Sequence, residues 1–227
     1  VGNDTLGTLT VHGHGGSNAA AALDTTAAGD LWDNTLMNTA ATPAAGRNAP
    51  FSSKSGDNLM VYSLPTMIDG LAVAASYQAA NSSGTGSTAY GLTYTGLEGL
   101  SVSYGSGASD DVAGAHGDQD IYKASYVYGS VTAGVSYNDY DSSTNSEDQT
   151  VTAFGLSYTV SDQISVSYGE ETIDRADVHE DIEVTGVSVS YTSGGMTASV
   201  SQTEAESSEH VANRDKELWN IGLSFAF

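Results

Sequence analysis

The segment Leu218-Trp-Asn-Ile-Gly-Leu-Ser-Phe-Ala-Phe227, at the end of the 227-residue chain, decides the fold. From Trp219 onward its odd-numbered positions are all large and apolar, whereas its even-numbered positions are Asn, Gly, Ser and Ala. This alternation has the side-chain period of a β-strand, because successive side chains of a strand point to opposite faces of the sheet. One face of the predicted strand is therefore apolar, and the other is small or polar.

The same alternation recurs along the chain between turn residues, and it predicts twelve strands. They span residues 6–13, 58–63, 71–78, 88–95, 100–105, 120–128, 131–138, 150–160, 164–170, 181–191, 196–202 and 216–227. Periodicity alone fits a soluble sandwich with its apolar faces inside. It fits equally well a barrel with lipid outside and water inside.

The connections between these strands alternate in length, and this favours the barrel. Short turns are predicted at residues 64–70, 96–99, 129–130, 160–163 and 192–195. Longer loops rich in acidic residues, Ser or Gly are predicted at 79–87, 106–119, 139–148, 170–180 and 203–215. Short turns on one side and long loops on the other are typical of outer-membrane barrels.

Tyrosines lie in two tiers along the predicted strands, as expected for the two lipid–water boundaries of a membrane. We assign to the membrane girdle the residues Tyr94, Tyr128, Tyr158, Tyr191 and Trp219. A second tier of tyrosines lies further from the short turns. The alternative is that Tyr is simply a favourable strand residue. We predict an all-β, antiparallel transmembrane barrel with twelve strands in this chain.

Composition excludes several classes of protein. Asp and Glu number 28 against 6 Lys and Arg, so the formal net charge is -22, which argues against a nucleic-acid partner. The absence of cysteine excludes disulfides, thiolate metal sites and cysteine nucleophiles. No stretch approaches the roughly 20 apolar residues of a membrane-spanning helix.

The last ten residues resemble the C-terminal assembly signal of bacterial outer-membrane proteins, with Phe225 and Phe227 as its aromatic residues. This resemblance implies that the outer-membrane assembly machinery is a partner. It also implies that the protein lies in the outer membrane of a Gram-negative bacterium, in contact with lipid and lipopolysaccharide.

Three further segments resemble general porins, and the acidic, arginine-poor sequence is most similar to porins of alphaproteobacteria. Asp57-Asn-Leu-Met-Val-Tyr-Ser-Leu-Pro65 and Gly70-Leu-Ala-Val-Ala-Ala-Ser-Tyr77 resemble the hairpin that follows the constriction loop of these proteins. Leu6-Gly-Thr-Leu-Thr-Val11 resembles the strand that enters the loop. The resemblance implies a single barrel domain over residues 1–227. Residues 14–55 would fold into the pore, and residues 56–227 would form eleven strands.

The strand count has a further implication under this resemblance. General porins have sixteen strands, and the constriction loop joins the fifth to the sixth. Here one strand precedes the loop and eleven follow it, so the first four strands of the barrel are expected to lie outside this chain. The alternative is a complete barrel of twelve strands, an even number that outer-membrane barrels allow.

The resemblance also directs attention to charged residues at the constriction. The predicted loop carries acidic Asp24, Asp30 and Asp33, with basic Arg47 and Lys54 near its exit. Lys123 is predicted to point into the lumen, because its neighbours on the strand face outward. We expect all six to line the constriction. The alternative for the aspartates is a role as solvated turn residues, and the alternative for Lys123 is simple solvation.

Metal and catalytic signals are weak. His12 and His14 lie on one side of the first strand without a third ligand nearby, so we interpret them as a strand-end pair. The acidic loops present carboxylates to Ca²⁺, but their spacing matches no ordered calcium loop, and no cofactor is predicted. No G-x-S-x-G motif occurs, so we expect no enzyme.

The function predicted from the sequence is passive diffusion of small hydrophilic solutes and ions across an outer membrane. Excess negative charge at one mouth favours cations weakly. The resemblance implies a homotrimer. Two other hypotheses remain open: a complete twelve-stranded barrel with an enzymatic or secretion role, and an acidic surface-layer β protein.

Overall fold

The computed structural model describes residues 2–3, 5–31, 58–79, 86–110, 116–142, 148–176 and 178–226. Its strands form one sheet in which each strand pairs with the next along the chain. They are β1 (Gly2–Asn3), β2 (Gly7–His12), β3 (Leu59–Ser63), β4 (Leu71–Gln78), β5 (Gly86–Leu97), β6 (Leu100–Asp110), β7 (His116–Tyr128), β8 (Val131–Ser142), β9 (Gln149–Thr159), β10 (Ile164–Arg175), β11 (Ile182–Ser193), β12 (Met196–Glu206) and β13 (Lys216–Phe225). The twelve predicted strands are thus present as β2 to β13, and β1 adds a two-residue pairing at the edge.

The register keeps the apolar and polar rows on opposite faces of the sheet. On one face Val166 pairs with Val189, Val189 with Val200, and Val200 with Ile221. Val166 is half-buried, whereas Val189, Val200 and Ile221 are exposed, and Ile221 has a relative accessibility of 85%. A continuous exposed apolar face is unfavourable in water but is what a lipid-facing barrel wall requires. The alternation predicted from the sequence is therefore confirmed, with the apolar face outside.

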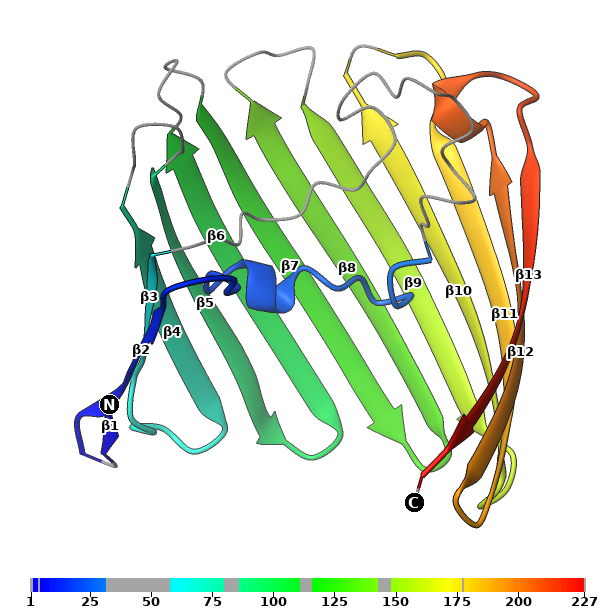
Figure 1. Ribbon diagram of the computed structural model, residues 1–227, viewed down its shortest axis with the longest axis horizontal. Coiled ribbons are helices and arrows are strands. Elements are labelled where there is room, and N and C mark those ends of the chain that lie inside the picture. Colours follow the sequence, from blue (N-terminus) through cyan, green and yellow to red (C-terminus); the bar gives the residue numbers. More distant parts are fainter. Residues whose placement is uncertain are drawn as a thin grey trace.

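The sheet curves, and its concave face is crossed by the segment that follows β2 (Figure 1). Within the described residues, no pairing joins β13 to β1 or β2, so the sheet is open between its two edges. The turns at Gly129 and Gly194 have φ values of 57° and 59°, a conformation that glycine adopts without steric cost. No helix in the described ranges has the length and apolar character needed to cross a membrane.

Several strands are longer than predicted, which corrects the predicted loops. β6 ends at Asp110 instead of residue 105, β10 at Arg175 instead of 170, and β12 at Glu206 instead of 202. These added ends are mostly polar, and Ile173 and Ala205 within them are buried on the concave face, so the outward-facing apolar alternation does not continue. Their backbone groups nevertheless continue the antiparallel hydrogen-bond ladder, which does not depend on side-chain polarity.

Buried apolar residues gather on the concave face and not between two sheets. One cluster contains Val151, Ile173, Ile182, Val184 and Ala205, and it packs against Leu31 and Leu218. The other contains Ala19, Ala20, Ala89 and Ile121, and it packs against Leu23 and Ala74. The crossing segment contributes Ala19 and Ala20 to the second cluster and packs Leu31 against the first, so both clusters lie where this segment contacts the wall.

Candidate pore constriction

The inner segment, defined here as residues 18–31, lies against the concave face across β4 to β11 (Figure 1). It contains the short 3₁₀ helix η1 (Ala21–Leu23). Two of its backbone amides donate to wall hydroxyls: Ala19 N to Ser76 Oγ at 3.0 Å, and Ala27 N to Ser136 Oγ at 2.9 Å. These bonds provide partners for amides that would otherwise be buried without one.

A tight turn in the inner segment is closed by Thr26 and Asp30. The amide of Thr26 donates to Asp30 Oδ1 at 2.7 Å, and the amide of Asp30 donates to Thr26 Oγ1 at 2.9 Å. The Thr26 hydroxyl in turn donates to the carboxylate of Glu171, which is 1% exposed. Asp30 has a φ of 55° and also lines a cavity of about 300 Å³ against β10 to β13. Its carboxylate therefore closes a turn and faces open space.

Asp24 and Lys123 lie near each other at the centre of the inner segment. Lys123 Nζ donates to the carbonyl of Thr25, and Asn138 Nδ2 donates to the carbonyl of Asp24 at 3.3 Å. Burial raises the pKa of the Asp24 carboxyl to about 6, and the negative charge of Asp30 adds to this shift. The positive charge of Lys123 acts in the opposite direction. The predicted constriction thus contains a carboxyl, that of Asp24, whose pKa is raised well above its ordinary value.

Three of the six predicted constriction residues, Asp24, Asp30 and Lys123, therefore lie together on the concave face. The inward orientation of Lys123 is confirmed by its contact with the inner segment. Asp33, Arg47 and Lys54 lie outside the described residues.

The wall residues that hold the inner segment were not identified from the sequence. Ser76, Ser136 and Asn138 lie on polar strand faces among many similar residues, so nothing distinguishes them in the pattern. Glu171 was assigned to a loop, because β10 was predicted to end at residue 170. The structure extends β10 past this residue and buries its carboxylate on the concave face, where it accepts a hydrogen bond from Thr26.

Aromatic residues occupy the outer face in two tiers. Rings of Tyr90, Tyr104, Tyr122 and Tyr137 follow one another across β5 to β8, with centroids 5.9, 5.0 and 6.3 Å apart. Of the girdle residues beside the short turns, Tyr128, Tyr158 and Tyr191 are exposed and Tyr94 is half-buried.

Trp219 and Phe225 mark two different heights on β13. Trp219 pairs with Gln202 and donates its indole N–H to the Glu217 carboxylate, so it lies far from the turn between β12 and β13. Phe225 pairs with Met196 beside that turn and is exposed. Phe227, the other aromatic of the predicted assembly signal, lies outside the described residues.

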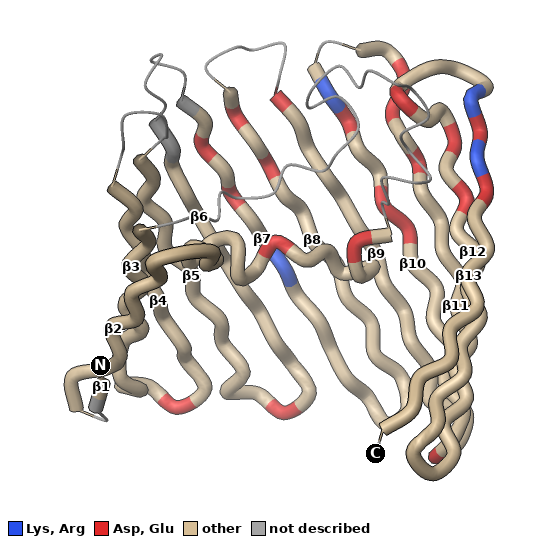
Figure 2. The backbone as a smooth tube through the Cα atoms, in the orientation of Figure 1, with Lys and Arg blue, Asp and Glu red and all other residues tan. Residues whose placement is uncertain are grey.

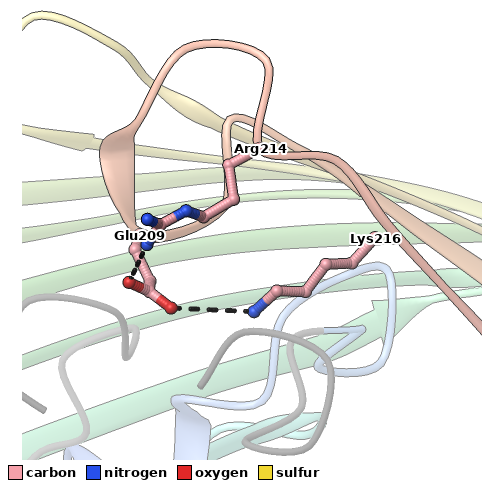
Figure 3. Close-up of polar contacts among 3 residues, drawn as sticks. All are labelled: Glu209, Arg214 and Lys216. Carbon is pink, nitrogen blue, oxygen red and sulfur yellow. Dashed lines mark hydrogen bonds and ion pairs between the residues drawn. The ribbon is translucent and has the colours of Figure 1, made fainter. Parts of the chain in front are cut away.

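Charge is distributed unevenly along the sheet. Acidic residues gather toward the ends of the strands opposite the short turns, and few lie at the other end (Figure 2). At this rim, in the loop between β12 and β13, Glu209 pairs with Arg214 and lies 3.8 Å from Lys216 Nζ (Figure 3). The Arg214 side chain is 45% exposed, so its ion pair contributes little to stability.

Metal ligands are not assembled in the part of the chain that the structure describes: no group of three or more His, Asp or Glu is placed to hold an ion. His12 and His14 are among the described residues, so they do not belong to such a group. Ca²⁺ binding by the acidic loops stays a prediction.

A family model described as Gram-negative porin matches residues 3–181 of the sequence. The chain belongs to the Gram-negative porin family. A search of curated proteins found no match. Family and fold together place this porin in the outer membrane of a Gram-negative bacterium.

Solved structures of outer-membrane proteins share the fold of this porin at low sequence identity. The anion-selective porin from Comamonas acidovorans is 14% identical, with a TM-score of 0.75 over 98% of this chain and 75% of its own. OmpT of Vibrio cholerae is 14% identical, with a TM-score of 0.69 over 98% and 78%. OmpF of Salmonella typhi, in complex with daunomycin, is 14% identical, with a TM-score of 0.64 over 97% and 75%. The all-β barrel fold predicted from the sequence is confirmed.

Proposed function

We propose that this porin is a passive diffusion channel for small hydrophilic solutes and ions, with a weak preference for cations and no catalytic step. Membership of the porin family supports the channel. The observation that carries the proposal is the inner segment, which lies on the polar concave face while the apolar face points outward. A polar lumen narrowed by a chain segment selects solutes by size and charge.

The preference for cations rests on the charges around the lumen. Asp24 and Asp30 lie on the inner segment, and carboxylates dominate the rim of the sheet (Figure 2). Lys123, held on the backbone carbonyl of Thr25, is a single positive charge among these carboxylates and offsets only part of their field. Negative charges concentrate cations within a Debye length, about 8 Å at physiological salt. The Comamonas relative is described as anion-selective, so the shared fold does not itself determine the sign of the preference.

The same proposal assigns the remaining predicted residues to the constriction. Residues 14–55 as a whole would form the constriction loop. Asp33 would then add to its acidic side, and Arg47 and Lys54 would face that side from the loop exit.

Closure of the barrel is also part of the proposal. An open edge leaves backbone N–H and C=O groups unpaired, which is costly within lipid. We infer that four strands lying wholly or mainly outside this sequence, the last of them ending in β1, join β13 to β2 and give a barrel of sixteen. The mass of the intact polypeptide tests this directly. A mature protein no longer than the present chain would instead require β13 to pair with β1 and β2.

Assembly into a homotrimer is proposed on the basis of the family and of one structural relative. OmpT of Vibrio cholerae has been solved in a trimer form. Closed cyclic symmetry is the usual form of homo-oligomers. Lipid, lipopolysaccharide and the outer-membrane assembly machinery complete the proposed partners.

Swelling of liposomes that contain the purified protein tests the channel. Neutral sugars of increasing size should enter at rates that fall steeply with solute size. Empty liposomes and liposomes with heat-denatured protein serve as controls. Swelling rates equal to those of the controls for even the smallest sugar would refute the proposed function.

A further inference from the structure

Four glycines of the wall lie directly beneath the inner segment, and we call them the glycine seat: Gly91, Gly155, Gly169 and Gly186. A Cβ atom at Gly155 would lie 1.9 Å from the carbonyl oxygen of Ala27 and 2.8 Å from its carbonyl carbon. At Gly91 a Cβ atom would lie 2.5 Å from the carbonyl oxygen of Ala19. Only glycine permits such close approach of two backbones.

The strand register brings three of these glycines into one continuous row. Gly155 on β9 pairs with Gly169 on β10, and Gly169 pairs with Gly186 on β11. Within this row, a Cβ atom at Gly169 would lie 2.9 Å from Ala28 Cβ, and one at Gly186 would lie 2.5 Å from Leu31 Cδ2. The inner segment from Ala27 to Leu31 therefore rests on bare backbone.

The hydrogen bonds of the inner segment depend on this close contact. The amide of Ala27 donates to Ser136 Oγ at 2.9 Å, and the neighbouring Thr26 hydroxyl donates to Glu171. A displacement of the segment by about 1 Å away from the wall would lengthen the distance from Ala27 N to Ser136 Oγ beyond hydrogen-bonding range. The glycines and the polar wall residues thus specify the same position of the segment.

We propose that the glycine seat sets the open cross-section of the pore by fixing how closely the inner segment lies against the wall. The inference rests on the proposed channel function and identifies Gly155 as its main positioning residue. Real Cβ atoms essentially never approach other atoms within 3.0 Å. An alanine at position 155 therefore requires a shift of about 1 Å, and under this proposal the Ala27 carbonyl moves by this amount toward the pore axis.

Gly134 provides a matched control on the adjacent strand. It pairs directly with Gly155, and it also lies on the concave face beneath Ala27. A Cβ atom at Gly134 would lie 3.4 Å from Ala27 Cβ and from the Ala124 carbonyl oxygen, which is an ordinary contact. Gly134→Ala therefore makes the same chemical change without displacing the segment.

Single-channel conductance of the intact protein in planar bilayers tests the proposal, together with the size at which neutral polymers are excluded. Gly155→Ala should lower both the conductance and the polymer cut-off, whereas Gly134→Ala should match the wild type. Heat-modifiable gel mobility first shows that each variant is folded. If Gly155→Ala does not fold, Gly91→Ala takes its place with the same expectation, because a backbone oxygen lies 2.5 Å from its Cβ position.

Three results would overturn the proposal. Gly155→Ala with wild-type conductance would show that the segment does not set the cross-section. Equal changes in Gly155→Ala and Gly134→Ala would show that the effect does not arise from the clearance beneath Ala27. An increased conductance would mean that the segment leaves the lumen. A wild-type protein without conductance would instead refute the channel function itself.

Discussion

Replacement of Leu223 by arginine tests which face of β13 meets lipid. Leu223 pairs with Ala198 and is 60% exposed on the apolar face. Strands rise about 3.4 Å per residue and tilt by roughly 40°, so each residue spans roughly 2.6 Å of membrane depth. Leu223 is then about 5 Å from the level of Phe225 and about 10 Å from that of Trp219. This is well within the apolar band.

Arginine on the lipid face costs about 2–4 kcal/mol at the midplane and about 0–1 kcal/mol near the interfaces. At the depth of Leu223 we expect a cost of about 2–3 kcal/mol, which is roughly a 30- to 150-fold change in the folding equilibrium. Urea titration of folding into liposomes, followed by heat-modifiable gel mobility, measures this cost.

Ser224→Arg is the matched control. Ser224 pairs with Thr197 on the concave face, so its arginine would reach water in the lumen. We expect a cost well below that of Leu223→Arg. An equal cost for the two variants, or a larger one for Ser224→Arg, would refute the assignment of faces.

The remaining predictions concern charge and assembly. Because the pKa of Asp24 is raised to about 6, its carboxylate is charged above this pH and neutral below it, so cation preference should fall between pH 7.5 and 5. Reversal potentials in a salt gradient measure this, and Asp24→Asn should remove most of the change. Lys123→Met removes the charge that lowers the pKa of Asp24, so the midpoint of that titration should move to higher pH; an unchanged midpoint would contradict the proximity of the two groups. Asp30→Asn should shift the reversal potential toward anions, more strongly at low than at high salt. Native mass spectrometry in mild detergent should give three copies, and a monomer with a complete barrel would argue against the trimer.

Much of the fold could be predicted because each strand carries its own signal. β4 was predicted residue for residue as 71–78, since its apolar alternation is bounded by turn residues on both sides. The distal ends of β6, β10 and β12 were missed. Their residues are mostly polar and extend beyond the apolar band, where the outward-facing side chains no longer contact lipid and so no longer need to be apolar.

The candidate site could be predicted only in part, because it is built from contacts that are distant in sequence. Alternation alone placed Lys123 on the lumen side. The bond from Thr26 to Glu171 joins residues 145 positions apart, and no local pattern predicts it. The function of Asp30 in closing a turn was among the alternatives, and its bonds with Thr26 support that alternative without excluding a role in the pore.

Single-channel recording in a planar lipid bilayer tests most directly whether this porin forms a water-filled, charge-selective pore. The proposed function predicts stepwise conductance that rises with salt concentration. It also predicts a reversal potential of the sign expected for cations when the two sides hold different KCl concentrations. Folded protein that gives no conductance steps would contradict the channel, and a reversal potential of the opposite sign would contradict the cation preference.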